Sequence, residues 1–297
     1  MSGLQQSHLA RSYLYAPGNN ERILLKAFDA GADAVILDLE DAVPPEKKRE
    51  ARRMVAEVLR QRTRLEGLRI YVRINSMATD LWRDDLEAVV QPAVHGIRLP
   101  KVESGEQMRE FNLALDEAEG RAGIGPLCVV PAVETAAGVL AAAEIVKAPR
   151  IESLGFGIVD FVRDIGVEPD SSGLQTLYAQ SYVVLVSRAA GLIPPVASVH
   201  AQIRDMEGLR ATSEAAKRLG FFGRSCLHPS QIPIVHEVFT PSSAQVAEAR
   251  AIVEAFNRTK AQGSGALSME NGEFVDKPVA ERAQALIDLA EGLKRTT

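Results

Sequence analysis

The chain has 297 residues, of which 46% are hydrophobic and 25% charged, and its formal net charge is -5. This composition is typical of a globular protein, and the length suits one large α/β barrel or two ordinary domains. The acidic balance argues against a nucleic-acid-binding protein, and we find neither an apolar signal-peptide core nor a run long enough to span a bilayer. Cys128 and Cys226 lie in apolar runs. We expect them to be reduced thiols, so we predict a cytoplasmic protein.

Short apolar segments alternate with helix-length amphipathic segments along most of the chain. The predicted strands are residues 12–15, 34–37, 70–72, 96–99, 127–130, 153–156, 195–198 and 221–227. Strands that alternate with helices pair in parallel through right-handed crossovers. The sequence therefore predicts an α/β fold, a (β/α)8 TIM barrel over residues 1–240. An open doubly wound sheet is the alternative.

Residues 241–297 are predicted to form a C-terminal extension with a different pattern. A helix is expected over residues 245–260, followed by a flexible break at Gly263–Gly265. Residues 266–275 resemble a hairpin that turns at Asn271-Gly272, and a last helix is expected over residues 279–294.

Charged side chains follow the ends of several predicted strands. They are Asp38, Glu40 and Asp41 after the second strand, Arg73 after the third, Glu134 after the fifth and Asp160 after the sixth. All strands of a parallel barrel open onto the same face at their carboxyl ends, where active sites are built. We therefore expect these side chains to converge in one cup.

Glu134 and Asp160 are the predicted ligands of a metal ion. Mg²⁺ prefers oxygen ligands and commonly takes one or two protein carboxylates together with water and substrate oxygens, so we predict Mg²⁺, with Mn²⁺ as the alternative. The chain has no HExxH segment of the kind that binds zinc. The competing interpretation is that Glu134 caps the next helix and Asp160 is a solvated loop acid.

Arg73 is the predicted clamp for a substrate carboxylate, because its planar guanidinium can bind a carboxylate at two points. The alternative role is a buried ion pair with Glu40 or Asp41. Asp38 and Glu40 should share a face of the extended chain, with one acid directed at Arg73 and another at a metal-bound water. A cluster of acids that favours the start of the next helix is the other interpretation.

Several short motifs, taken together, carry a family resemblance. They are Tyr15–Gly18 (YAPG), Val35–Val43 (VILDLEDAV), Val72–Asn75 (VRIN), Leu99–Ser104 (LPKVES), Val133–Ala136 (VETA), Gly157–Asp160 (GIVD) and Leu227–Ile232 (LHPSQI). With these motifs in this order over nearly the whole length, the chain resembles the citrate lyase β-subunit-like proteins of the HpcH/HpaI aldolase superfamily.

The resemblance implies a (β/α)8 barrel, Mg²⁺ on Glu134 and Asp160, and a substrate carboxylate or keto acid on Arg73. It also implies a homotrimer or hexamer in which the C-terminal extension packs on a neighbouring subunit. In the acyl-CoA branch an Asp of that extension acts as general acid or base across the interface, and the matching residue is Asp276. The competing role for Asp276 is the N-cap of a helix near Val279.

Two segments depart from the family pattern. Ile158 and Val159 precede Asp160 where the family usually has an acid, which makes this wall more apolar and leaves the substrate open. Glu273 and Phe274 stand where relatives often have smaller or apolar residues, which leaves the docking of the extension open.

The function predicted from these residues is a Mg²⁺-dependent carbon–carbon lyase. It would cleave or form a 3-hydroxyacyl-CoA thioester, such as citramalyl-, malyl- or citryl-CoA, with an α-keto acid and an acyl-CoA as the other partners. The alternatives are a thioesterase on malyl-type CoA, a class II aldolase on free keto acids, and a citrate lyase β subunit acting on an acyl-carrier-protein thioester.

Roles follow for the candidate residues. The predicted catalytic residues are Asp276, Arg73, Asp41 and Glu40; the predicted substrate-binding residues are Arg73, Glu134 and Asp38; and the predicted contacts to CoA phosphates are Arg22, Lys26 and Arg11. No lysine is needed as a Schiff base, so an electrostatic or structural role is expected for Lys101.

Overall fold

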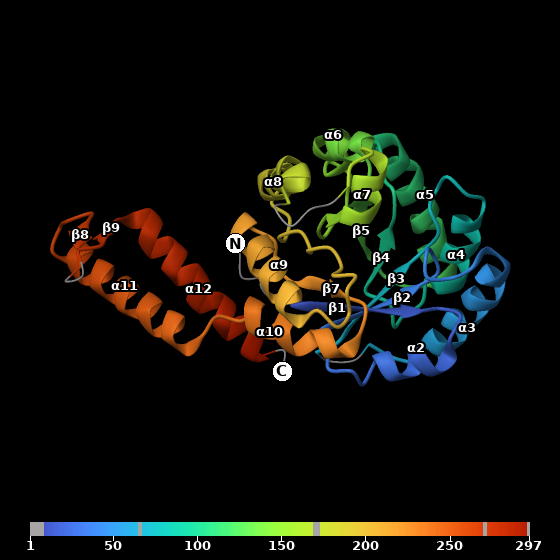
Figure 1. Cartoon of the computed structure of the whole chain (residues 1–297), viewed down its shortest axis with the longest axis horizontal. Coiled ribbons are helices and arrows are strands. Elements are labelled where there is room, and N and C mark those ends of the chain that lie inside the picture. Colours follow the sequence, from blue (N-terminus) through green and yellow to red (C-terminus); the bar gives the residue numbers. More distant parts are fainter. Residues whose placement is uncertain (1–8, 65–66, 169–172, 270–271, 296–297) are drawn as a thin grey trace. The chain divides into compact units, whose positions relative to one another are not determined.

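Short buried segments form a curled, parallel, seven-stranded sheet in the computed structural model, which describes residues 9–64, 67–168, 173–269 and 272–295 (Figure 1). Its strands are β1 (Ser12–Pro17), β2 (Ala34–Asp38), β3 (Arg69–Arg73), β4 (Gly96–Leu99), β5 (Cys128–Val133), β6 (Gly155–Phe156) and β7 (Arg224–Cys226). Their spatial order is β6-β5-β4-β3-β2-β1-β7. The predicted α/β class and parallel pairing are confirmed. This order winds in one direction from β1 to β6, unlike the reversed order of a doubly wound sheet.

The segment predicted as the seventh strand, residues 195–198, makes only isolated bridges in the structure. Val196 bridges Gly155 of β6, and Ala197 bridges Arg224 of β7. Pro194 directly precedes this segment and Pro195 begins it, and neither can donate a backbone hydrogen bond, which limits the ladder that can form there. The structure thus shows seven strands in the described sheet where the sequence predicted eight.

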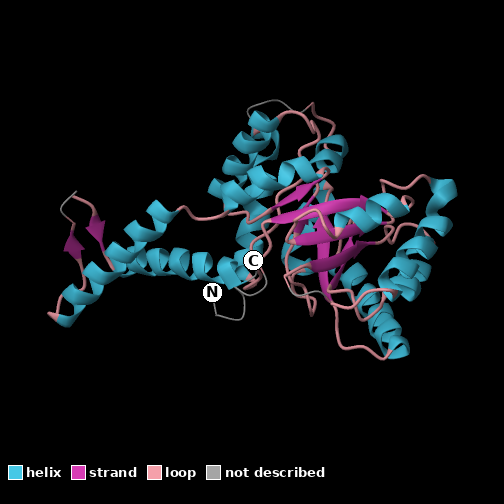
Figure 2. Ribbon diagram, turned by 90° about the horizontal axis from the view of Figure 1, so that it is seen from below, coloured by secondary structure: helices cyan, strands magenta, loops and turns pink. Residues whose placement is uncertain are grey.

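Helices cover the outer side of this sheet (Figure 2). In chain order they are α2 (Glu21–Ala27), α3 (Lys48–Arg60), α4 (Leu81–Val89), α5 (Gly105–Ala122), α6 (Ala136–Ile145), α7 (Ile158–Asp164), α8 (Leu174–Ala189), α9 (Met206–Leu219) and α10 (Ile232–Phe239), with short 3-10 turns at Pro45–Lys47 and Pro229–Gln231. All five residues of β2 are buried, as expected for a parallel strand with both faces covered. Helix α3 shows the matching amphipathic pattern, because it buries Val55 and Leu59 one turn apart.

Side-chain caps begin the helices that follow three of the strands. Asn20 accepts a hydrogen bond from Ile23 N at the start of α2, Ser104 from Gln107 N at α5, and Thr135 from Gly138 N at α6. Such caps satisfy backbone N–H groups that have no partner within the helix. They fix the points at which the chain turns away from the carboxyl ends of the strands.

The described residues from Val238 onward belong to a second compact unit, distinct from residues 10–237. Its elements are α11 (Ser243–Ala261), β8 (Leu267–Ser268), β9 (Phe274–Val275) and α12 (Lys277–Arg295). Ile252, Val275 and Ile287 pack in its small core, and β8 pairs with β9 in antiparallel fashion. The predicted helix, hairpin and helix are therefore confirmed. Asn271 of the predicted turn lies outside the described residues.

None of the described helices is both long enough and apolar enough to cross a bilayer.

Candidate active site

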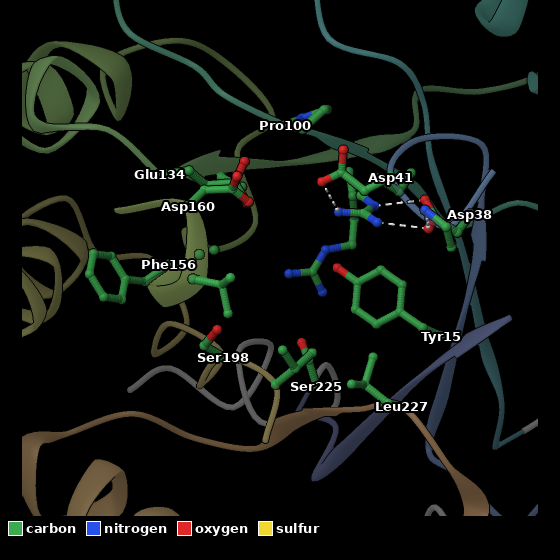
Figure 3. A pocket seen from close by; sticks show the side chains of 18 of the residues that line it. Tyr15, Asp38, Asp41, Pro100, Glu134, Phe156, Asp160, Ser198, Ser225 and Leu227 are labelled. Atoms are coloured by element: carbon green, nitrogen blue, oxygen red, sulfur yellow. Dashed lines mark hydrogen bonds and ion pairs between the residues drawn. The ribbon is translucent and has the colours of Figure 1, made fainter. Parts of the chain in front are cut away.

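A pocket of about 370 Å³ opens at the carboxyl ends of the parallel strands (Figure 3). Its lining residues are Tyr15, Pro17, Asp38, Asp41, Ala42, Arg73, Arg98, Pro100, Ala132, Glu134, Gly155, Phe156, Gly157, Val159, Asp160, Val196, Ser198, Val199, Ala201, Ser225 and Leu227. The pocket therefore brings together Asp38, Asp41, Arg73, Glu134 and Asp160, which are distant in sequence. Figure 3 shows Glu134 and Asp160 on one side of the pocket and Asp38 with Asp41 on the other.

Arg73 is held rigidly by Asp38. The register of the sheet places Asp38 beside Arg73, and the fully buried Asp38 carboxylate accepts hydrogen bonds from Arg73 Nε and Nη2, each 2.7 Å long. The backbone N–H groups of Glu40 and Ala42 also donate to Asp38. The Asp38 carboxylate is thus occupied by four donors. It orients Arg73, and we assign it this positioning role in place of the direct substrate contact predicted from the sequence.

A second acid, Glu40, completes the surroundings of Arg73. Its Oε2 lies 2.7 Å from Arg73 Nη1, and its Oε1 accepts a hydrogen bond of 2.5 Å from Lys101 Nζ. Glu40 itself is buried and does not line the pocket. The ion-pair network considered for Arg73 is therefore present. Asp38 accepts from Nε and Nη2 and Glu40 lies against Nη1, so only the remaining N–H groups of Nη1 and Nη2 are available to a ligand in the pocket.

Lys101 lies between Glu40 and Asp41 with its ammonium 3.4 Å from Asp41 Oδ1. Burial acts to lower the pKa of Lys101, but the hydrogen bond and charge of Glu40, followed by Asp41, outweigh it and raise the pKa. Burial likewise acts to raise the pKa of Asp41, but Lys101 and Arg73 outweigh it and lower this pKa. Lys101 is therefore a stable cation, as its expected electrostatic role requires, and Asp41 is a stable carboxylate.

Glu134 lines the pocket from the single position between the end of β5 and Thr135, the N-cap of α6. Only Lys101 N donates a described hydrogen bond to Glu134, at 3.1 Å. Gly157 makes room for this side chain, since a Cβ atom on residue 157 would lie 2.3 Å from Glu134 Oε1. Burial, followed by the charges of Glu40 and Asp160, raises the pKa of Glu134 to about 7. The cap role considered for Glu134 is therefore filled by Thr135.

Asp160 lies in the first turn of α7, directly after β6. Its carboxylate is half-buried and forms an ion pair of 2.6 Å with the largely exposed Arg163. The donor set of Glu134 and Asp160 fits a hard divalent cation, because both ligands are carboxylates and their mutual repulsion is one cause of the raised Glu134 pKa. A cation between them would remove that repulsion.

The structure separates Arg11 from the other two predicted CoA contacts. Arg22 and Lys26 are exposed on α2, and Arg22 lies in the first turn of this helix, shortly after the carboxyl end of β1. Arg11, in contrast, precedes β1, at the end of the strands remote from the pocket. Its Nε and Nη2 donate to the two oxygens of Asp33 at 2.8 and 2.9 Å. This ion pair occupies the Arg11 guanidinium, so Arg11 is not a candidate for contact with CoA.

Asp276 belongs to the second unit and is the N-cap of α12. Its Oδ1 accepts a hydrogen bond of 3.2 Å from Val279 N, and its carbonyl oxygen accepts one from Ala280 N. The cap considered from the sequence is therefore present. A role for Asp276 at a neighbouring subunit stays a prediction.

The sequence interpretation missed Arg98, Ser198 and Ser225, which also line the pocket. Arg98 had a recognisable signal. It is a charged residue inside the otherwise apolar segment Gly96–Leu99, and arginine is rarely buried without a reason. Ser198 ends the predicted strand 195–198 and Ser225 lies within β7, and neither has a comparable signal.

Comparison with known proteins agrees with this geometry. The HpcH/HpaI aldolase/citrate lyase family matches residues 11–229, which is most of the chain. The chain belongs to this family. A citrate lyase subunit beta-like protein from Deinococcus radiodurans is 36% identical, over 94% of this chain and 96% of that protein. The mitochondrial citramalyl-CoA lyase of Homo sapiens is 33% identical, over 96% of this chain and 86% of that protein.

Solved structures of the family show the same fold. Protein CitE from Mycobacterium tuberculosis, in complex with magnesium, acetoacetate and coenzyme A, superposes with a TM-score of 0.79 at 32% identity and covers 96% of this chain and 99% of that one. The citrate lyase beta subunit of the same organism, complexed with oxaloacetate and magnesium, gives a TM-score of 0.67 at 32% identity, over 80% of this chain and 100% of that one. The family predicted from the motifs is confirmed.

Proposed function

We propose that this chain is a Mg²⁺-dependent carbon–carbon lyase that cleaves or forms a 3-hydroxyacyl-CoA thioester, with an α-keto acid and an acyl-CoA as the other partners. The observation that carries the proposal is the convergence of Arg73, Glu134 and Asp160 on one pocket. A cation site and a carboxylate clamp at one pocket are what the cleavage of a β-hydroxy acid derivative requires.

The relatives support this chemistry. Structures from M. tuberculosis hold magnesium with acetoacetate and coenzyme A, with oxaloacetate, or with pyruvate. Citramalyl-CoA lyases of mammals and citrate lyase beta subunits of bacteria are similar to this chain over most of its length. We infer that the ligand class is shared, with a small keto acid in the pocket and a thioester at its mouth.

Glu134 and Asp160 would hold the magnesium ion, which when bound supplies a Lewis acid that stabilises negative charge on substrate oxygens. Arg73 would hold the carboxylate of the keto-acid moiety with the N–H groups that Asp38 and Glu40 leave free. The bidentate contact from Asp38 keeps the guanidinium in one orientation, so the bond that breaks is aligned before the reaction.

Two proton transfers accompany cleavage. The hydroxyl group of the substrate loses its proton as the carbon–carbon bond breaks, and the enolate of the acyl-CoA then gains a proton at carbon. We assign the first transfer to Asp41, which lines the pocket and which Lys101 and Arg73 keep ionised, with Glu40 supporting this charged network. We assign the second to Asp276 of a neighbouring subunit.

The proposal extends to the assembly. We infer that Val196 and Ala197 are the remnant of an eighth strand that closes the barrel between β6 and β7. We also infer a homo-oligomer, a trimer or hexamer, in which the second unit packs on a neighbouring barrel. Arg22 and Lys26 are our candidates for contacts to the CoA phosphates, because both are exposed cations on α2.

Incubation of the purified protein with free citramalyl-, malyl- and citryl-CoA tests the proposal, with released keto acid and released thiol measured separately. We expect keto acid to form with Mg²⁺ present, to stop when a chelator is added and to resume when Mg²⁺ is restored. Free thiol without keto acid would identify a thioesterase instead. Turnover that requires an acyl-carrier protein would identify a lyase subunit. Turnover that a chelator does not affect would exclude the metal mechanism.

A further inference from the structure

Arg98 is a buried cation in the pocket with no described partner for part of its guanidinium. It lies in β4, its exposed fraction is only 5%, and it lines the same pocket as Arg73. Its Nη1 is buried without a hydrogen-bond partner among the described residues. The nearest described aromatic contact is to the ring of Tyr13, whose centroid lies 5.7 Å from Arg98 Cζ.

Arg98 differs from Arg73, the other arginine of the pocket, in having no acidic partner among the described residues. The sheet register pairs Arg73 with Arg98, so both residues lie at the same level of adjacent strands. Arg73 is matched by Asp38 and Glu40 at 2.7 Å, whereas no acid of the described chain lies within 4.0 Å of the Arg98 guanidinium. A buried charge without a counter-ion is costly, which indicates that a ligand supplies the anion.

The pocket that Arg98 lines leaves space for such a ligand. Gly155 accommodates the guanidinium itself, because a Cβ atom on residue 155 would lie only 3.1 Å from Arg98 Nη2. Phe156, Val159 and Val196 line the same pocket and provide no charge to compete for the ligand. A small anionic group can therefore reach Arg98 in a largely apolar part of the pocket, where an ion pair is only weakly screened.

We propose that Arg98 binds a second carboxylate of the ligand and so selects a dicarboxylic keto acid. This inference rests on the proposed function, in which the first carboxylate and the keto group lie at Arg73, Glu134 and Asp160. A planar carboxylate matches the fork of a guanidinium better than a spherical anion does. Arg98 is in this account a specificity-determining residue and takes no part in proton transfer.

Calorimetric titration of the holoprotein, loaded with Mg²⁺, with pyruvate and with freshly dissolved oxaloacetate tests the inference. The two acids share the keto and carboxylate groups, and oxaloacetate adds one carboxylate. We expect the wild-type protein to bind oxaloacetate at least about tenfold more tightly, as is common for one charge-assisted hydrogen-bond pair. Arg98→Met should abolish this preference and leave the Kd of pyruvate within about twofold. Arg98→Lys should retain part of the preference.

Arg210→Met is the matched control, because the same side-chain change then occurs on the outer helix α9, at an arginine paired with Glu237. It should leave both Kd values unchanged. Circular dichroism and thermal melts establish that the variants fold. The comparison of pyruvate with oxaloacetate on the wild-type protein does not depend on any variant.

Several outcomes would overturn the inference. Equal binding of the two acids by the wild-type protein would do so and would leave the proposed function intact. If Arg98→Met kept the preference for oxaloacetate over pyruvate, or lost affinity for both acids equally, Arg98 would have a structural role. Pyruvate affinity that rises with chloride concentration, with no oxaloacetate preference, would show that Arg98 holds a free anion. Failure to bind either acid would overturn the proposed function together with this inference.

Discussion

At the scale of single residues, burial and neighbouring charges set the ionisation of the acids that line the pocket. Asp41 and Glu134 line the same pocket, yet the pKa of Asp41 is lowered and that of Glu134 is raised to about 7. Lys101 and Arg73 dominate at Asp41, whereas burial and neighbouring acids dominate at Glu134. Near neutral pH the Asp41 carboxyl group is therefore ionised and able to accept a proton, whereas Glu134 is close to its own pKa and exchanges a proton there.

The raised pKa of Glu134 predicts the pH dependence of Mg²⁺ binding. A carboxyl group with a pKa of about 7 is mostly protonated below that pH, and only the carboxylate binds the metal. We expect Mg²⁺ affinity to fall by about tenfold from pH 8 to pH 6, since roughly a tenth of the groups are ionised one unit below the pKa. Calorimetric titration of the metal-free protein measures this.

The Glu134→Gln variant provides the comparison for this titration. It should bind Mg²⁺ weakly at every pH and lose the slope. Glu117→Gln, an exposed change on α5, is the matched control and should keep both the affinity and the slope. Affinity that is constant from pH 6 to pH 8 in the wild-type protein would contradict a protonated Glu134.

At the scale of secondary-structure elements, the turns between strands and helices place the site. Glu134 occupies the single residue between the end of β5 and the N-cap of α6, and Asp160 lies in the first turn after β6. Each acid is therefore fixed close to a rigid strand end, which suits the precise placement that a metal site requires.

The N-cap of α12 offers a test of Asp276 that separates stability from catalysis. Asn is as good an N-cap as Asp, whereas Ala is poor and typically costs about 0.5–2 kcal/mol. Asp276→Ala should therefore lower thermal stability, and Asp276→Asn should preserve it. Because Asn cannot transfer the proton, both variants should lose turnover by roughly 10²–10⁴-fold. Normal turnover in Asp276→Asn would leave Asp276 with the capping role alone.

At the scale of the whole molecule, the second unit has its own small core and contains Asp276, whereas the pocket lies in residues 10–237. If Asp276 serves a neighbour, the Asp276→Asn and Glu134→Gln variants damage different parts of one shared site. Subunits exchanged between the two inactive variants should then form some intact sites.

We expect a mixture of the two variants, dissociated and reassembled together, to recover a measurable fraction of wild-type turnover. Each variant reassembled alone is the control and should stay inactive. Sedimentation or light scattering measures the oligomeric state in parallel. A monomer, or a mixture no more active than its parts, would contradict the shared site.

Much of the fold could be predicted from the sequence because it depends on local patterns. Alternating apolar and amphipathic segments gave the parallel α/β class and the helix–hairpin–helix order of the second unit, and both are confirmed. Residues 195–198 were harder to predict, since two prolines weaken the ladder of an otherwise strand-like segment. The motifs predicted the family, which the comparisons confirm. The oligomeric state and the cytoplasmic location stay predictions.

The sequence by itself determined which chemical groups stand at the strand ends, because a strand's carboxyl end can be read from its local pattern. Only the tertiary structure decided how these groups share charge. Asp38 became a support for Arg73, Arg11 paired with Asp33 away from the pocket, and Arg98 was left without an acid among the described residues. Such pairing depends on distances between neighbouring strands that are separated in sequence by tens of residues. Because Coulomb energies fall with distance and rise with burial, those distances, which local patterns do not encode, decide the role of each charge.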